Sequence, residues 1–202
     1  MADGSTLPNM RKPTAAFVIV LALLPGCRAK ESPANVAALI EDLKGADKDK
    51  SGQASLALIR LGAPATPAVV ELLGTTDPRL RSLALTTLWG MGARAESAVP
   101  TLAETLADPD PEMRNGAAMA LANMGPAAAP AVPALIKALG DGESRVRQTA
   151  VKALGNIGPA ARDAVPVITG AVKRGAWPEG EEALRQIQGR PEQTPSPSPE
   201  AH

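Results

Sequence analysis

Few residues in this chain of 202 amino acids have the types and spacing that chemistry needs. The only cysteine, Cys27, cannot form a disulfide within the chain and has no second thiol with which to hold a metal or run redox chemistry. The only histidine is His202, and no Gly-rich phosphate loop follows a strand-like stretch. We therefore expect that the protein is not an enzyme, has no catalytic residue and binds no cofactor.

One stretch is similar to a calcium-binding loop. The sequence DKDKSGQ fills the first, third, fifth and sixth positions of such a loop with Asp47, Asp49, Ser51 and Gly52. The twelfth position should be a Glu that supplies two oxygens, but here it is Leu58, on the apolar face of a predicted helix. Two interleaved lysines also disfavour a cation. We predict a solvated loop between two helices and no metal site.

The first 27 residues have the pattern of an export signal. Arg11 and Lys12 precede the apolar run AAFVIVLALL, which is too short for a spanning helix of about 20 residues. The run ends in Leu24-Pro25-Gly26-Cys27, which resembles the bacterial lipobox. The resemblance implies cleavage before Cys27 and acylation of that residue. The alternative is an ordinary secretory signal with an incidental cysteine near its end.

The resemblance to a lipobox predicts how the N-terminal segment is divided and where in the cell the protein lies. Residues 1–26 are the predicted lipoprotein signal peptide, and residues 27–33 are the anchor and linker. Acylated Cys27 then attaches the protein to a membrane of the cell envelope. Residue 28 is Arg rather than Asp, which favours the periplasmic side of the outer membrane in a Gram-negative cell.

Charge and aromatic content restrict the function and the core. The 21 basic and 21 acidic residues balance, so the chain lacks the basic surface that binding to a phosphate backbone needs, and we expect no nucleic-acid partner. The only aromatic residues are Phe17, Trp89 and Trp177. A core made of Ala, Leu, Val and Ile favours close packing of helix on helix.

A stretch of 25 residues occurs three times, at 78–102, 111–135 and 144–168, with a spacing of 33 residues. A fixed period of this length predicts an array of units, each packed on its neighbours. Each unit has the signals of a helical hairpin. Its first helix begins at Pro67, Pro100, Pro133 or Pro166. Its second helix begins after Asp77 or Asp110 and ends at Gly62, Gly92, Gly125 or Gly158, and we predict a left-handed cap at Gly62.

Less regular segments flank the three copies. Residues 34–43 and 53–61 have apolar side chains at helical spacing and form a predicted first hairpin. Residues 179–188 continue the columns as half a unit with charged outward positions, as a polar terminal cap requires. Residues 190–202 are rich in Pro and Ser and cannot bury a core, so we predict a disordered tail.

The unit looks like a short HEAT-type repeat of the phycobilisome-lyase class. The pattern Asp-x-x-x-Arg-x-x-Ala-x-x-Ala-Leu-x-x-x-Gly, followed by Val-Pro-x-Leu, is matched well by Arg147, Ala150, Leu154, Gly158 and Pro166. Thr87 and Trp89 depart from it. The resemblance covers residues 34–189 and implies an all-α fold, a right-handed α-solenoid of about 4.5 HEAT-like helical hairpins. It concerns the repeat and does not imply lyase activity.

Two sets of columns are candidates for a role beyond the core. One is a predicted structural ladder in which an acid lies four residues before an arginine, so that the two meet on one helix face or bridge to the next unit: Asp77, Arg81, Asp110, Arg114, Glu143 and Arg147. The other is a predicted protein-binding face on the second helices: Ser82, Thr86, Trp89, Asn115, Met119, Gln148, Lys152 and Arg185. The alternative for the second set is that its members are merely solvated.

These observations lead to one functional hypothesis and two alternatives. The hypothesis is a monomeric, lipid-anchored cell-envelope protein that acts as a scaffold for another protein. The first alternative is a passive structural lipoprotein of the envelope without a dedicated partner. A lyase-like enzyme comes third.

Overall fold

The computed structural model describes residues 33–174, 177 and 179–189. The predicted signal peptide, Cys27 and the predicted tail at 190–202 lie outside the described residues. All regular structure in the described part is helical, which confirms the all-α prediction. The helices are α1 (Pro33–Lys44), α2 (Lys48–Leu61), α3 (Thr66–Glu71), α4 (Pro78–Met91), α5 (Val99–Thr105), α6 (Pro111–Met124), α7 (Val132–Ala138), α8 (Ser144–Ile157), α9 (Val165–Lys173) and α10 (Gly180–Ile187).

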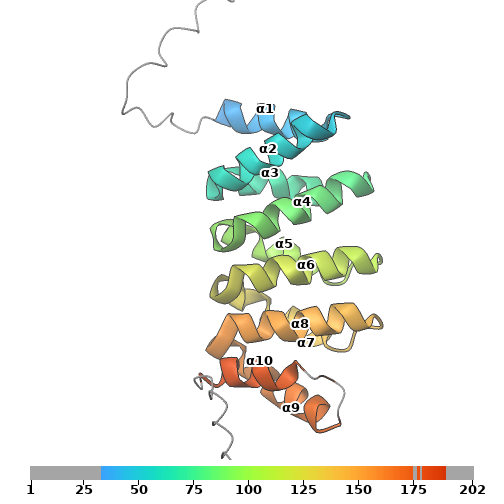
Figure 1. Ribbon diagram of the computed structural model, residues 1–202, viewed down its shortest axis with the longest axis vertical. Helices are drawn as coiled ribbons and strands as arrows, with labels where there is room; N and C mark the ends of the chain where they lie inside the picture. Colours follow the sequence, from blue (N-terminus) through green and yellow to red (C-terminus); the bar gives the residue numbers. More distant parts are fainter. Residues whose placement is uncertain (1–32, 175–176, 178, 190–202) are drawn as a thin grey trace, which may run out of the picture. The chain divides into compact units, whose positions relative to one another are not determined.

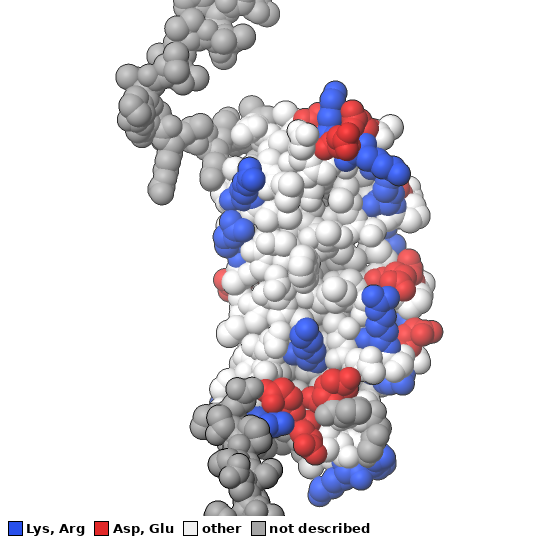
Figure 2. All heavy atoms as spheres, viewed as in Figure 1, with Lys and Arg blue, Asp and Glu red and all other residues white. Residues whose placement is uncertain are grey.

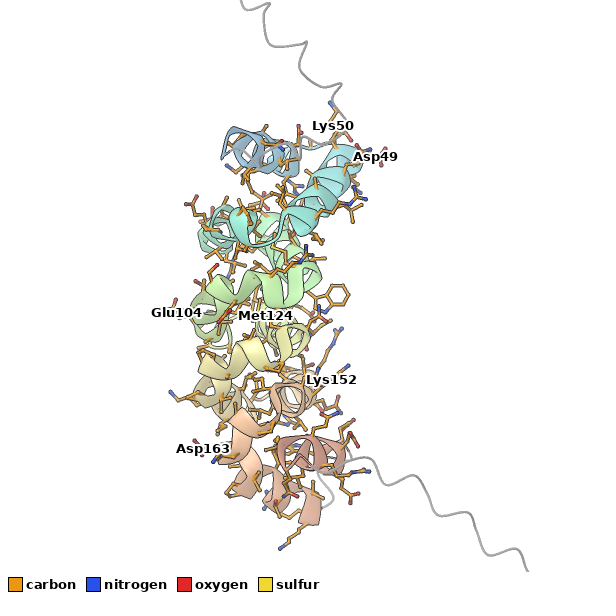
Figure 3. All side chains as sticks on the ribbon, turned by 90° about the vertical axis from the view of Figure 1, so that its left-hand side faces the viewer. Asp49, Lys50, Glu104, Met124, Lys152 and Asp163 are labelled. Carbon is orange, nitrogen blue, oxygen red and sulfur yellow. The ribbon has the colours of Figure 1, made fainter. Side chains whose placement is uncertain are left out.

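The helices form hairpins that stack one on the next (Figure 1). The second helices of the hairpins, α2, α4, α6, α8 and α10, make one layer, and the shorter first helices α3, α5 and α7 lie behind it. In the view turned by 90°, Lys152 lies on the side of the second helices, while Glu104 and Asp163 lie on the opposite side (Figure 3). The last pair is short, because α10 has 8 residues where α4, α6 and α8 each have 14. The array is therefore the predicted α-solenoid, ending in an incomplete unit.

The second helices begin where the Asp-Pro pairs predict. The Asp77 carboxylate accepts hydrogen bonds from the amides of Arg79 and Leu80 at 2.8 and 3.4 Å, and Pro78 is the first helical residue. Asp110 caps α6 in the same way through the amide of Glu112 at 2.9 Å. The third copy differs, since the Glu143 side chain makes no capping bond to α8.

The second helices end at glycines with a positive φ. Gly62, Gly92, Gly125 and Gly158 have φ between 57° and 74°, but their ψ of −128° to −141° lies far from the left-handed helical region that we predicted for Gly62. The backbone is instead in the mirror image of the extended region, which a side chain excludes. A tight turn here lets a 3₁₀ segment such as Gly92–Ala98 lead directly into the next first helix.

The core is made of columns that repeat along the array. In the second helices one column is fully or almost fully buried: Leu58, Leu88, Leu121, Leu154 and Ile187. A matching column in the first helices is Val69, Leu102, Leu135 and Ile168. Burying one such side chain stabilises the fold by about 1.5–3 kcal/mol. Alanines between the leucines, of which Ala84, Ala117 and Ala150 are fully buried, leave room for neighbouring helices to approach closely.

The segment that is similar to a calcium loop is part of a helix. α2 begins at Lys48, five residues before the predicted start, and Asp47 is its cap, accepting from the amides of Asp49 and Lys50 at 3.0 and 3.2 Å. Ser51 is buried and donates to the carbonyl of Leu43 at 3.1 Å. The predicted solvated loop is therefore wrong. In the described residues no group of three or more His, Cys, Asp or Glu side chains could hold a metal ion.

The run Pro111–Ala138 is long and apolar enough to cross a bilayer by length and composition. In the array, however, it comprises α6, a 3₁₀ segment and α7, with a turn at Gly125 between them. Its apolar side chains fill the core between hairpins; Leu121 and Leu135 are completely buried. The run is thus the second helix of one hairpin and the first helix of the next.

The turn glycines provide a first test. The Cβ of an alanine at position 125 would meet only ordinary contacts, so Gly125→Ala isolates the cost of the positive φ. We expect it to lower the free energy of unfolding by about 1–3 kcal/mol, measured by urea denaturation. The control is Gly52→Ala on α2, where the added Cβ meets nothing within 4 Å and helix propensity favours alanine. Equal stability of the two variants would contradict the assignment.

Candidate functional site

Ion pairs link adjacent repeats at the N-terminal end of the second helices. Arg81 of α4 pairs with Asp108, which follows α5 of the next hairpin. Arg114 of α6 makes a two-point contact with Asp141, with Nε and Nη2 at 2.7 and 2.9 Å from the two carboxylate oxygens. All four side chains are at least three-quarters buried. Each pair therefore fastens one hairpin to the next.

These pairs correct the predicted ladder. Arg81 and Arg114 bridge to the next unit, which is one of the two arrangements that the prediction left open, but the acids in the prediction are wrong. Asp77 and Asp110 are occupied as helix caps, and no ion pair between Glu143 and Arg147 is found in the described residues. Arg147 instead donates from Nη1 to the carbonyls of Asp141 and Gly142 at 2.7 and 2.9 Å. The signal we missed is the same 33-residue spacing between Asp108 and Asp141.

The pairing shifts the acidity of its members. The hydrogen bond from Arg114 lowers the pKa of Asp141, although partial burial acts against it. Partial burial raises the pKa of Asp108, but the amide of Asp110 and the Arg81 guanidinium outweigh it, so that pKa is lowered as well. The Asp141 carboxylate raises the pKa of Arg114. Both aspartates are therefore held in the charged form that the ladder needs.

Amide and hydroxyl side chains link the second helices elsewhere along their length. Asn123 donates to the carbonyl of Trp89 at 2.7 Å, and Asn156 donates to the carbonyl of Ala122 at 2.9 Å. These carbonyls lie in the last turn of a helix, where intrahelical donors run out. Midway along α2 and α4, the hydroxyls of Ser55 and Thr87 are 2.9 Å apart. Side-chain bonds thus link neighbouring second helices near their C-terminal ends and, between α2 and α4, midway along them.

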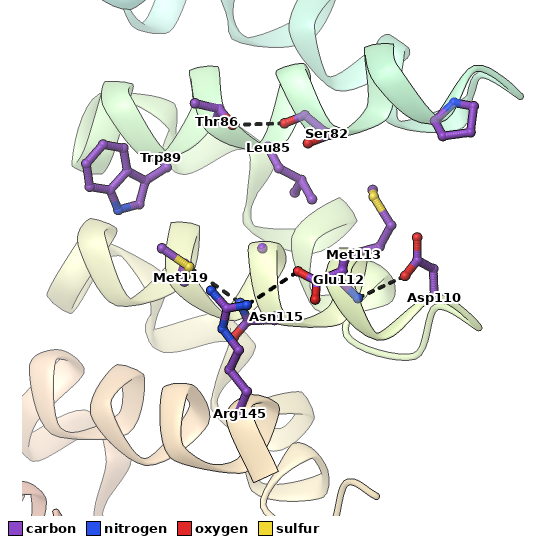
Figure 4. Close-up of a pocket in the computed structure, with 12 residues that line it drawn as sticks. Ser82, Leu85, Thr86, Trp89, Asp110, Glu112, Met113, Asn115, Met119 and Arg145 are labelled. Atoms are coloured by element: carbon purple, nitrogen blue, oxygen red, sulfur yellow. Dashed lines mark hydrogen bonds and ion pairs between the residues drawn. The ribbon is translucent and has the colours of Figure 1, made fainter. Parts of the chain in front are cut away.

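A groove of about 390 Å³ lies between α4 and α6, on the face of the second helices (Figure 4). Trp89 and Met119 stand toward one end of it, and Asp110 stands at the other. Arg145 reaches up from α8 and forms an exposed ion pair with Glu112 at 3.7 Å. The floor contains Leu85 and Gly116. A Cβ at position 116 would lie 2.7 Å from Cδ1 of Leu85, so only glycine fits against that leucine as it stands.

Five of the eight predicted binding residues line this groove: Ser82, Thr86, Trp89, Asn115 and Met119. Trp89 is 46% exposed and Met119 is 41% exposed, two of the few large apolar side chains that reach the surface. The structure therefore brings together the part of the predicted face that belongs to α4 and α6. Gln148 and Lys152 are exposed on α8 and Arg185 is half-buried on α10, away from the groove.

Asn115 is buried, although it was predicted to face outward as part of the protein-binding face. Its Oδ1 accepts from the hydroxyl of Thr149 at 2.9 Å, which links α6 to α8. Its amide nitrogen lies 3.6 Å from the sulfur of Met119. Asn115 thus connects neighbouring repeats beneath the groove and contacts the side chain of Met119, an arrangement that helical periodicity alone does not predict.

Charge is distributed unevenly on this face. No charged residue follows Arg81 in α4 or Arg114 in α6, so the middle of the face is almost uncharged and the charges gather at its edges (Figure 2). In the column that contains Met119, the residues are uncharged in the first repeats, with Leu56 and Thr86, and basic in the last two, with Lys152 and Arg185. Beyond the groove the same face therefore carries the exposed Lys152 on α8 and, on α10, an Arg185 that is paired with Glu182 at 3.4 Å.

A model of HEAT repeats matches residues 36–122 and 99–187, most of the array. The chain is a HEAT-repeat protein. None of the curated proteins matches the sequence. The family and the fold agree with the resemblance read from the columns of Arg, Leu, Gly and Pro.

Solved structures show the same architecture. An engineered protein shares 26% identity with a TM-score of 0.58, covering 76% of this chain and 79% of its own. The complex of CpcE and CpcF of phycocyanin lyase from Nostoc sp. PCC7120 shares 19% identity with a TM-score of 0.62, covering 78% and 99%. A designed armadillo repeat protein in complex with the peptide (KR)4 shares 18% identity with a TM-score of 0.56, covering 75% and 81%. The last two, at such identity, show the fold alone.

The Arg114–Asp141 pair predicts a dependence of stability on pH. Because the pKa of Asp141 is lowered in the folded state, its contribution is present above the ordinary value near 4 and is lost as the pH falls through the lowered value. Asp141→Asn should lower the melting temperature at pH 7 by about 2–5 °C, and the difference from wild type should shrink below about pH 4. Exposed Asp163→Asn is the control. A difference that stays constant down to about pH 2 would contradict this role.

Proposed function

We propose that this HEAT-repeat protein is a binding scaffold, and that it holds a segment of another protein in the groove between α4 and α6. The observation that carries the proposal is the exposure of Trp89 and Met119 on opposite sides of one preformed groove. A tryptophan and a methionine contribute strongly at protein interfaces, because both bury much apolar area and methionine adapts to its partner.

The surroundings of the groove support binding of a peptide segment. The uncharged middle of the face loses little hydration when it is covered. Lys152 follows on the same face of α8, so an acidic residue of a bound segment would be attracted toward α8, whereas Arg185 of α10 is already paired with Glu182.

The proposal includes a tether in the cell envelope. It is supported by the basic start, the apolar run and the Leu-Pro-Gly-Cys sequence that ends at Cys27. One acyl chain gives only marginal attachment, whereas two or more anchor a protein stably. The scaffold would then present its face to partners at a membrane surface, and the solenoid would supply no chemistry of its own.

The groove is tested by crosslinking in intact cells. A photoreactive amino acid at Met119 should give a discrete protein adduct, and Trp89→Ala should reduce that adduct about tenfold, as expected for a central contact residue. The matched control is the same amino acid at Val167 of α9, which is 44% exposed but lies in the layer of first helices. A passive structural protein would give no discrete adduct at Met119, or the same adduct at both positions.

The tether is tested by metabolic labelling. The wild-type chain should incorporate labelled fatty acid and sediment with membranes. Cys27→Ser removes the only thiol, so it should abolish labelling and either release the protein or leave the leader uncleaved. Labelling that persists in Cys27→Ser would exclude acylation at this residue.

A further inference from the structure

We propose that the chain's own C-terminal segment, residues 190–202, occupies the α4–α6 groove in the free protein, with Pro195–Pro199 against Trp89 and Met119. The groove would then be self-occupied, and a partner would have to displace the segment. This inference rests on the proposed function of the groove as a peptide-binding site, and it adds the identity of a resident ligand.

The segment begins at the same edge of the array as the end of the groove that contains Trp89. Gly189 follows α10 in the column that contains Asn156 and Asn123, and in register with Gly90. This column runs along the C-terminal ends of the second helices, which is also where Trp89 lies. The segment therefore starts on the same side of the face as the apolar end of the groove.

The segment is long enough. Packed helices lie about 8–10 Å apart, so the groove, two to three helices from α10, is about 20–25 Å away. A proline-rich chain in the polyproline II conformation advances about 3.1 Å per residue, which places Pro195 about 19 Å and Pro199 about 31 Å beyond Gly189. The alternating prolines, Pro195, Pro197 and Pro199, thus bracket the position of the groove.

The proline-rich segment and the groove are chemically complementary. Proline-rich segments bind grooves lined by aromatic side chains, because they lose little entropy and expose prolyl rings and carbonyls. Trp89 offers an aromatic surface and an indole N–H donor, and Met119 offers an adaptable apolar contact on the facing helix. The segment has no large apolar side chain, so this weak but matched contact is the one that it can make.

Charge sets the direction of the segment. Glu192 is three residues beyond Gly189, about 9 Å along the chain, which is one helix spacing and reaches Lys152 of α8. The pair would guide the segment from α10 over α8 toward α6. Because the segment is attached, its effective concentration at the groove is of millimolar order, so even a weak contact keeps it seated.

The experiment uses the full chain with a bimane fluorophore on Ser196→Cys, in a background of Cys27→Ser and Trp177→Phe. Trp89 is then the only tryptophan, and tryptophan quenches bimane on contact. We expect the bimane fluorescence to be about half that of the same chain carrying Trp89→Phe, and to be independent of protein concentration, as an intramolecular contact requires. Circular dichroism checks that each variant is folded.

Two charge reversals make the test selective. Lys152→Glu should relieve the quenching, while Lys137→Glu, exposed on α7 in the other layer, should not. Equal bimane fluorescence in the chain with Trp89 and in the Trp89→Phe variant would overturn the inference. Quenching that appears only at high protein concentration would also overturn it, because a second copy would then supply the segment. If quenching is absent while Met119 still crosslinks a partner, the inference fails and the proposed function stands.

Discussion

The contact between adjacent second helices is the constraint on which the rest of the structure depends. The alanine and leucine columns bring α4, α6 and α8 close together, and side-chain bonds fix how far one helix slides along the next. Asn123 and Asn156 hold the C-terminal ends, while the Arg81 and Arg114 ion pairs hold the N-terminal ends. A surface held at both ends has little freedom to rearrange, so the groove is present before any ligand arrives.

Equivalent positions in successive repeats can be buried in the core in one repeat and exposed at the surface in another. In α6 the position of Asn115 is buried and bonded to α8, whereas the equivalent Ser82 and Gln148 are exposed. The position of Trp89 corresponds to alanine and glycine in the next two repeats. Variation at equivalent backbone positions therefore shapes the groove between α4 and α6 in an otherwise regular array. This local exception, rather than the repeat itself, carries the functional argument.

Most of the fold could be predicted from the sequence, because Asp-Pro starts, glycine ends and buried Leu and Ala columns are local signals that recur with a fixed period. The acids of the ladder could not be predicted from helical spacing. Asp77 has two possible uses, capping its helix and pairing with Arg81, and the amides of its own helix win because they are closer in the chain. Asp108 meets Arg81 only through the stacking of hairpins. The burial of Asn115 likewise depends on Thr149 of the next repeat.

The central claim is that α4, α6 and α8 form one rigid face in which the groove is preformed. Native-state hydrogen exchange on the purified full chain tests this most directly, because it reports the opening free energy of each helix. The account predicts that the interior amides of these three helices exchange at rates within about tenfold of one another, as one cooperative unit. Exchange of α4 and α6 that is about a hundredfold or more faster than that of α8 would show that the groove opens and closes independently, and would contradict the account.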